Sequence, residues 1–333
     1  MRNRESVDVV GRKAESPASG CKDDAPTSSL PTVLLIVGAG RSGSTLLDTL
    51  VGQAPGAVAV GEMNYFWAAG YEEDVLCSCG APLRQCEFWR GVVLNAYGEL
   101  SGDGISELAR IENRVARRRN APRIRFSVLR AASFRQDVRR YLDSLRRLYR
   151  SVAERSASSL IVDASKEPSQ AHLLREAGFE VKVLHLVRDP RAVVYSRQRK
   201  KRKLEDSEGN TYMPIQSTLM ASVKWTGVNI LSERLKGNGF PYLRIRYEDL
   251  VGNPEGVTRE ILGFAEMPSD DLAYIQGKSI RIQASHIPLG NPGKFVGDEI
   301  EVHGDFQWSN KMVWYRRLLV RLISWPLLNR YSY

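Results

Sequence analysis

A glycine-rich stretch near the start of the chain constrains the fold more than any other part of the sequence. Residues 32–50 read TVLLIVGAGRSGSTLLDTL, an apolar run followed by three closely spaced glycines and then by leucines at helical spacing. The apolar run has the length and the β-branched content of a buried strand. A strand, a glycine-rich turn and a helix start together predict an anion-binding loop, because N–H groups at a helix N-terminus have no intrahelical partner.

The loop differs from a nucleoside triphosphate-binding P-loop at one position. Its G-x-x-x-x-G-S-T pattern carries Ser44 where the P-loop has a lysine that reaches the β- and γ-phosphates, and Arg41 lies inside the loop instead. Enzymes that hydrolyse ATP or GTP with Mg²⁺ normally need that lysine. The pattern therefore predicts a phosphate-type cradle without ordinary triphosphate hydrolysis, and the alternative is a turn that binds nothing.

Composition sets wider bounds. The chain has 333 residues and a formal net charge of +10, which favours an anionic ligand, a membrane surface or nucleic acid without choosing among them. Four cysteines are too few for a disulfide scaffold. The sequence shows neither an apolar run of the roughly 18 residues that a membrane span needs nor a secretory signal. We therefore expect a cytoplasmic protein. Residues 1–31, rich in charges, Ser, Pro and Gly, predict a disordered lead.

Two segments carry a resemblance to a known family. GAGRSGSTLL at 38–47 resembles the 5′-phosphosulfate-binding loop of sulfotransferases that use 3′-phosphoadenosine 5′-phosphosulfate (PAPS), and is closest to the carbohydrate and tyrosylprotein enzymes. VLHLVRDPRAVVYS at 183–196 resembles their 3′-phosphate-binding strand, turn and helix. The resemblance implies an α/β, three-layer P-loop-like fold with a mainly parallel sheet flanked by helices. It implies one sulfotransferase domain over 32–333, with a helical insert at about 104–159.

The same resemblance implies which residues bind PAPS. The loop residues expected to hold the 5′-phosphosulfate are Gly40, Arg41, Ser42, Gly43, Ser44, Thr45 and Leu46. Arg188 and Ser196 are expected to hold the 3′-phosphate, to which a guanidinium fork and a hydroxyl are well suited. Lys294 replaces an arginine that related sequences carry in a GNP-x-R context, so its contact with the cofactor is expected to be weaker.

Catalytic roles follow from the resemblance to tyrosylprotein sulfotransferases. Glu62 is the expected base, since a partly buried carboxylate can accept a hydroxyl proton. Lys166, just after a predicted strand, and Arg41 are expected to stabilise the leaving and transferring groups. The alternatives are a salt-bridged glutamate and a surface lysine. His286 is a second, weaker candidate for the base. In-line transfer of this kind needs no metal, and none is expected.

Cys77, Cys79 and Cys86 form a C-x-C-x₆-C pattern. This spacing is not the C-x₂-C pair of a common zinc site, and no histidine is near in sequence. The pattern therefore favours a structural loop or a disulfide over zinc.

Several alternatives remain open at this stage. The expected acceptor, by analogy, is a carbohydrate or polyhydroxylated metabolite, with no nucleic-acid partner. The rival functions are a P-loop-like ATP-dependent kinase and a basic module that binds nucleic acid or membrane. The arginine-rich helical pattern within 104–159 favours a solvated face or a substrate rim. Residues 308–333 favour a terminal helix docked on the core and ended by Pro326, over one lying on a membrane.

Overall fold

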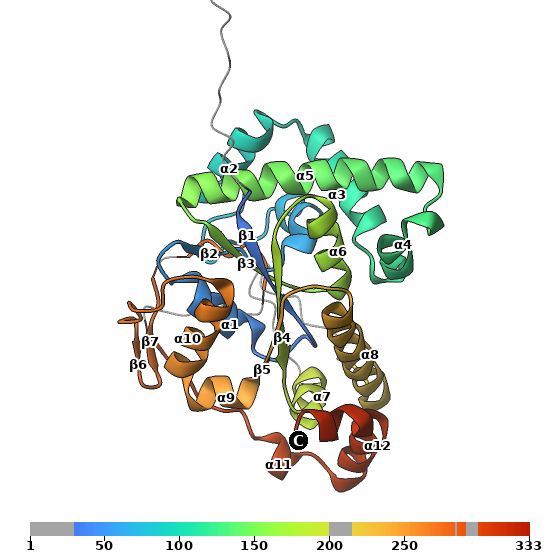
Figure 1. The fold of residues 1–333 in the computed structure, drawn as a ribbon, viewed down its shortest axis with the longest axis vertical. Helices are drawn as coiled ribbons and strands as arrows, with labels where there is room; N and C mark the ends of the chain where they lie inside the picture. The colour runs from blue at the N-terminus through green and yellow to red at the C-terminus, as the bar shows by residue number, and fades with distance from the viewer. Residues whose placement is uncertain (1–29, 200–214, 284, 291–298) are drawn as a thin grey trace, which may run out of the picture.

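The computed structural model describes residues 30–199, 215–283, 285–290 and 299–333. Lys294 and nearly all of the predicted lead lie outside these ranges. At the centre is a five-stranded, wholly parallel sheet in the order β2-β3-β1-β4-β5 (Figure 1). Its strands are β1 (Thr32–Val37), β2 (Ala57–Ala59), β3 (Leu160–Lys166), β4 (Val181–Val187) and β5 (Tyr242–Arg246).

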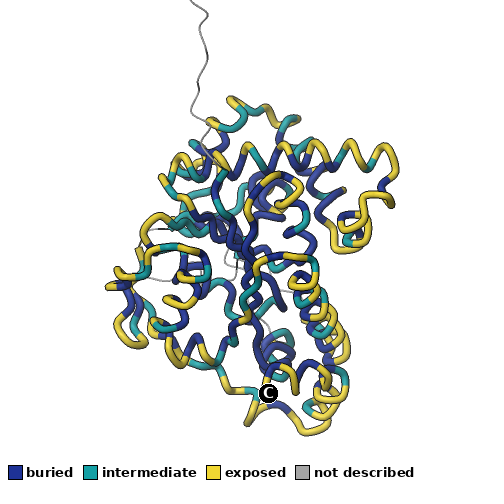
Figure 2. The backbone as a smooth tube through the Cα atoms, in the orientation of Figure 1, coloured by how far each residue is buried: buried dark blue, intermediate teal, exposed yellow. Residues whose placement is uncertain are grey.

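Side chains of the central strand β1 alternate between two hydrophobic clusters, so helices cover both faces of the sheet. Val33 and Leu35 face one cluster, and Leu34 and Ile36 face the other. The first face is covered by α2 (Glu87–Tyr97), α3 (Gly102–Val115), α5 (Ala132–Ser156) and α6 (Pro168–Glu176). The second is covered by α1 (Ser44–Gly52), α9 (Tyr247–Gly252) and α10 (Pro254–Ala265). The predicted three-layer α/β fold with a mainly parallel sheet is confirmed, and Figure 2 shows the sheet buried between these layers.

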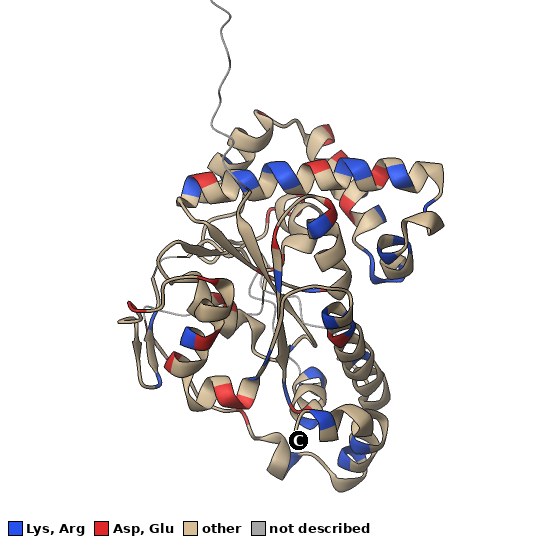
Figure 3. Ribbon diagram, in the orientation of Figure 1, with Lys and Arg blue, Asp and Glu red and all other residues tan. Residues whose placement is uncertain are grey.

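The remaining elements lie around these layers. Four short 3₁₀ or π segments are η1 (Met63–Tyr65), η2 (Phe66–Tyr71), η3 (Arg118–Asn120) and η4 (Ser127–Leu129). The other helices are α4 (Ala121–Arg125), α7 (Pro190–Gln198), α8 (Thr218–Gly237), α11 (Trp308–Lys311) and α12 (Trp314–Arg330). A small antiparallel sheet joins β6 (Ile275–Gln276), β7 (Ser279–Arg281) and β8 (Glu299–Glu301). Lys and Arg residues recur along α5 and on α12 (Figure 3).

The C-terminal helix packs on the core, but the prediction that Pro326 ends it is wrong. Helix α12 continues through Pro326 to Arg330 and buries Leu327 and Leu328. The hydrogen bond that the proline removes is the one to the carbonyl of Leu322, a residue that is 68% exposed. Packing of the last turn therefore outweighs the break. Within the described residues, no helix is both long and apolar enough to cross a membrane.

A buried carboxylate ties the helical region to the core. Glu112 of α3 is 2% exposed and accepts hydrogen bonds from the backbone N–H groups of Trp67 at 3.1 Å and Ala68 at 2.8 Å. Burial raises the pKa of Glu112 to about 8, although these two N–H groups oppose the shift. The carboxyl group thus fixes the start of η2, only a few residues after Glu62.

Replacing Glu112 with Ala should lower the free energy of unfolding by about 2–4 kcal/mol, because two buried N–H donors lose their acceptor. Urea unfolding at neutral pH would measure the loss. The matched control is Glu107→Ala, which removes a partly exposed glutamate of the same helix and should cost at most about 1 kcal/mol. Equal stability of the two variants would show that Glu112 does not hold α3 to η2.

Candidate active site

The carboxyl ends of β1, β3 and β4 meet at one edge of the sheet, where ligands of open α/β sheets bind. A cavity of about 400 Å³ lies there. Residues 38–41 line it, together with Glu62, Tyr65, Arg118, Ser165, Lys166, Glu167, Ser196, Arg197, Arg199, Lys224, Trp225 and Gly290. The parallel sheet therefore brings five predicted site residues to one cavity: Gly40, Arg41, Glu62, Lys166 and Ser196.

Close packing explains the glycines of the loop after β1. Gly38 has φ +126°, and a Cβ there would lie 2.3 Å from the carbonyl oxygen of Leu186 in β4. Gly43 has φ +93° and caps α1, and a Cβ there would lie 2.5 Å from the ring of Tyr247. Arg41 also has positive φ, +76°, which strains a residue with a side chain. The loop is thus wedged between β4 and Tyr247.

Two buried hydroxyls of the loop make it fit an anion. Ser42 and Ser44 are 1% and 2% exposed, and neither Oγ has a hydrogen-bond partner among the described residues. Buried polar atoms nearly always have a partner, so unpaired ones at a helix N-terminus indicate a ligand with oxygen acceptors. Thr45 and Leu46 follow in the first turn of α1, both partly exposed.

The predicted base and the predicted cation form an ion pair. Lys166 Nζ lies 2.5 Å from Glu62 Oε1, and their side chains are 14% and 20% exposed. An irregularity of β3 aims the lysine: while β1 advances from Leu35 to Val37, the paired residue on β3 advances from Asp163 to Lys166. Lys166 also has φ +60°. Both groups therefore face the same cavity in a fixed arrangement.

A buried network holds the ends of β3 and η1 together. Asp163 is fully buried, and burial raises its pKa to about 6. It accepts hydrogen bonds from the Tyr149 hydroxyl at 2.7 Å and from the N–H and hydroxyl of Ser165. Ser165 Oγ in turn accepts from the N–H of Asn64 at 3.1 Å. The hydroxyl proton of Ser165 is thus committed to Asp163, and the network positions the residues around Glu62 and Lys166.

Four arginines line the cavity: Arg41, Arg118, Arg197 and Arg199. Burial, together with the positive charges of Arg41 and Arg118, lowers the pKa of Arg197. Arg197 donates to the carbonyl oxygen of Gly40 at 3.2 Å, and Arg118 pairs with Glu167 at 2.8 Å. An anion in the cavity would relieve the repulsion among the guanidinium groups. From the sequence, Arg118 belonged only to the arginine-rich helical pattern within 104–159, and Arg197 was not among the predicted site residues. Its position directly after Ser196, a predicted phosphate-binding residue, could have indicated that Arg197 belongs to the site.

The two residues expected at the 3′-phosphate occupy different places. Ser196 is 3% exposed and lines the cavity. Arg188 is 6% exposed and donates to the backbone oxygens of Arg41 and Asp305, each at 3.0 Å. Its guanidinium also lies over the Tyr247 ring, 4.2 Å from the centroid. In this arrangement Arg188 holds the loop in place through the backbone of Arg41.

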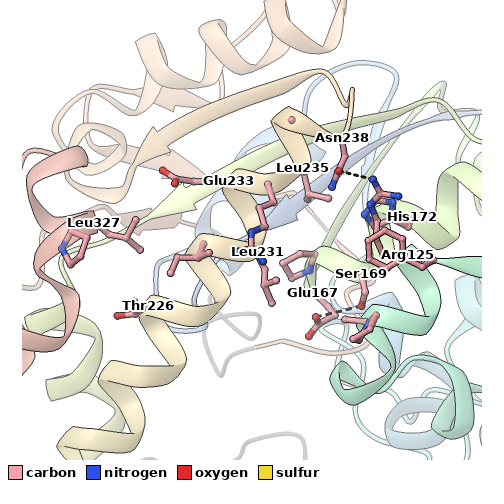
Figure 4. A pocket seen from close by; sticks show the side chains of 18 of the residues that line it. Arg125, Glu167, Ser169, His172, Thr226, Leu231, Glu233, Leu235, Asn238 and Leu327 are labelled. Atoms are coloured by element: carbon pink, nitrogen blue, oxygen red, sulfur yellow. Dashed lines mark hydrogen bonds between the residues drawn. The ribbon is translucent and has the colours of Figure 1, made fainter. Parts of the chain in front are cut away.

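A larger cavity adjoins the candidate active site. It has a volume of about 860 Å³ and lies between α4, α6, α8 and α12 (Figure 4). Apolar side chains such as Leu231, Leu235 and Leu327 line it, and Arg125 and Asn238 are hydrogen-bonded at its edge. Glu167 borders both cavities, so the two lie side by side.

The three cysteines predicted to form a structural loop or a disulfide make no disulfide. Cys77, Cys79 and Cys86 are free thiols, so the disulfide alternative is wrong. His286, the weaker candidate base, lies beside Cys86, with 3.3 Å between Nδ1 and Sγ. It is not among the residues that line the cavity of Glu62 and Lys166.

The sheet, the loop and the cavity together define an α/β protein with a glycine-rich loop suited to an anion at the carboxyl edge of its sheet. A model of the sulfotransferase family matches residues 31–271. The chain therefore belongs to the sulfotransferase family, and the family resemblance seen in the sequence is confirmed.

Two solved structures are similar to the chain. The sulfotransferase domain from the Synechococcus PCC 7002 olefin synthase is 22% identical, with a TM-score of 0.50 over 92% of this chain and 97% of that one. The sulfotransferase domain from the curacin biosynthetic pathway is 18% identical, with a TM-score of 0.49 over 92% and 99%. No curated protein matches the chain.

Substituting Gly43 with Ala should abolish binding of a phosphate ligand and destabilise the fold, because the new Cβ meets Tyr247 and the backbone keeps a positive φ. Gly239→Ala is the matched control, since Gly239 has φ +75° and nothing within 4 Å of an added Cβ. The control should cost about 1–2 kcal/mol from backbone strain alone. Chemical unfolding and ligand titration would separate the two effects, and identical behaviour of both variants would contradict the packing role of Gly43.

Proposed function

We propose that this sulfotransferase moves the sulfonate group of PAPS to a hydroxyl of an acceptor molecule. The observation that carries the proposal is the pair of buried hydroxyls of Ser42 and Ser44, which lack a hydrogen-bond partner among the described residues. Their loop, which contains Arg41, shares its cavity with Arg118, Arg197 and Arg199. Such a site offers hydrogen bonds and positive charge to a phosphosulfate. Membership of the sulfotransferase family supports sulfonyl transfer over the kinase and basic-module alternatives.

Different residues around the cavity would bind the two phosphate groups of the donor. The loop from Gly40 to Leu46 would hold the 5′-phosphosulfate. Ser196 would hold the 3′-phosphate, as the family resemblance implies, and Arg197 is the cation that faces the cavity beside it. Arg188, which the resemblance also assigns to the 3′-phosphate, donates to the backbone oxygen of Arg41 and would act by holding the loop. Tight positioning and fixed positive charge are the main means by which a site of this kind accelerates a group transfer.

The reaction is a direct displacement at sulfur. Glu62 accepts the proton of the acceptor hydroxyl while the acceptor oxygen bonds to sulfur and the bond from sulfur to the phosphate oxygen breaks. Lys166 and Arg41 stabilise the charge that develops on the leaving phosphate and on the sulfonate. The products are a sulfate ester, adenosine 3′,5′-bisphosphate and the proton on Glu62. The contact between Glu62 and Lys166 supports this pairing of base and cation.

The two adjoining cavities support a view of the acceptor. The hydrogen-bond donors of Arg118 and Arg199 suit a polyhydroxylated group, such as a sugar, beside the reacting centre. The larger cavity next to it, with its leucine-rich lining, would take an apolar part of the same molecule. Glycosides with alkyl chains are therefore the first acceptors for an activity screen.

Calorimetric titration tests the donor. Adenosine 3′,5′-bisphosphate should bind without metal and roughly tenfold or more tightly than AMP, because the 3′-phosphate adds charge-assisted hydrogen bonds. Arg197→Ala should weaken this binding by a similar factor. The matched control is Arg150→Ala, which removes the same charge from an exposed position on α5. Equal affinity for the bisphosphate and AMP, or preference for Mg-ATP, would overturn the proposed donor.

Glu62→Gln tests the base. Turnover should fall by about 10²-fold or more, as expected for loss of a general base, while bisphosphate binding remains. Glu73→Gln, at an exposed position in the next segment of the chain, serves as the control and should keep full activity. Steady-state sulfation assays on both variants would decide, and near-wild-type turnover of Glu62→Gln would remove Glu62 from this role.

A further inference from the structure

We propose that Cys77, Cys79, Cys86 and His286 form a structural zinc site. Their ligand atoms all lie within 4.8 Å of one another. Among the described residues, these four form a cluster of side chains that could bind a metal ion. Cys86 Sγ lies 3.7 Å from both Cys77 Sγ and Cys79 Sγ, and 3.3 Å from His286 Nδ1. The inference stands apart from the identity of the sulfonate donor.

These separations are those of a tetrahedral metal centre. With Zn–S bonds of about 2.3 Å and Zn–N bonds of about 2.0–2.1 Å, tetrahedral ligands lie about 3.8 Å apart between sulfurs and about 3.6 Å from sulfur to nitrogen. A disulfide would instead need its sulfurs at about 2.05 Å. The measured distances of 3.7 and 3.3 Å are therefore close to metal coordination and far from a covalent bridge.

The surroundings hold the histidine in place. The His286 ring stacks on Phe88, with 5.1 Å between centroids and 7° between planes. Trp89 Nε1 donates to the backbone oxygen of His286 at 2.5 Å. Ser78 lies between Cys77 and Cys79 and makes two hydrogen bonds with the residue after the histidine. Its backbone N–H donates to Ile287 O at 3.0 Å, and its Oγ accepts from the N–H of Ile287 at 2.9 Å. A ligand so constrained fits a preformed structural site.

The donor set selects the metal. Three thiolates and one neutral imidazole favour Zn²⁺ in a closed, four-coordinate site, the form that zinc takes in structural roles. Binding would release the three thiol protons, and no electron is transferred. Four protein ligands leave no open position for substrate, so the metal would act on the fold and not on the sulfonate transfer.

The site would anchor the segment that borders the active-site cavity. From His286 the chain continues to Leu289, whose carbonyl oxygen accepts from the N–H of Glu62 at 3.3 Å. Gly290, the next residue, lines the cavity. Gly61 packs so closely on this segment that a Cβ there would lie 2.3 Å from Leu289 O. A metal at the cysteines would thus fix one wall of the cavity and the backbone of Glu62.

Metal analysis of the purified full chain tests the proposal. After size-exclusion chromatography in a chelator-free, reducing buffer, we expect about one zinc per chain by mass spectrometry, with little iron. Cys86→Ser and His286→Ala should each lose most of this zinc. The matched controls are Cys21→Ser, which removes the fourth cysteine, and His303→Asn, an exposed histidine; both should keep it.

A second measurement does not depend on the variants folding. Wild-type protein stripped of metal and titrated with Co²⁺ should develop the intense visible absorption of tetrahedral cobalt thiolate, which Zn²⁺ then abolishes, and denatured protein with chelator should show four free thiols. Zinc below about one tenth per chain together with no cobalt spectrum would overturn the proposal. Two free thiols in place of four, or zinc kept by Cys86→Ser and His286→Ala, would also overturn it.

Discussion

The parallel pairing of β1 with both β3 and β4 is the constraint on which the site depends. Parallel strands end at a common edge, so the loop after β1, Lys166 at the end of β3 and the start of α7 after β4 must meet there. Glu62 reaches the same edge because β2 pairs with β3. Residues more than 100 positions apart, such as Glu62 and Lys166, are thereby held in contact by the hydrogen bonds of the sheet.

Strained backbone and buried polar groups at this site lower the free energy of unfolding, and the apolar packing of the buried layers must offset that loss. Arg41 and Lys166 both have positive φ, a conformation that costs about 1–3 kcal/mol for a residue with a side chain. The hydroxyls of Ser42 and Ser44 are buried and unpaired within the described part of the chain, and each adds about 1–3 kcal/mol. A bound anion would repay part of this cost, so a ligand of the loop should also stabilise the folded protein.

Local patterns allowed most of the fold to be predicted. The strand, glycine turn and helix at 32–50 are contiguous, and the family resemblance pointed to Glu62 and Lys166, which the structure places in contact. Features set by packing between distant segments were missed. Pro326 lies inside a helix because the last turn is buried against α7 and α8, and Arg197 belongs to the cavity wall although its neighbours in sequence form a basic run.

The cysteine loop shows the same limit in its strongest form. Three cysteines with an unusual spacing have no fourth ligand nearby in sequence, and His286 follows Cys86 by 200 positions. Only the fold brings the two together, because the segment from His286 to Gly290 runs along the backbone of Gly61 and Glu62. The cavity wall and the cysteine cluster therefore share one short piece of chain. Loss of order in the cluster would disturb the backbone contact between Leu289 and Glu62. A change in turnover should therefore accompany any loss of order at the cysteines.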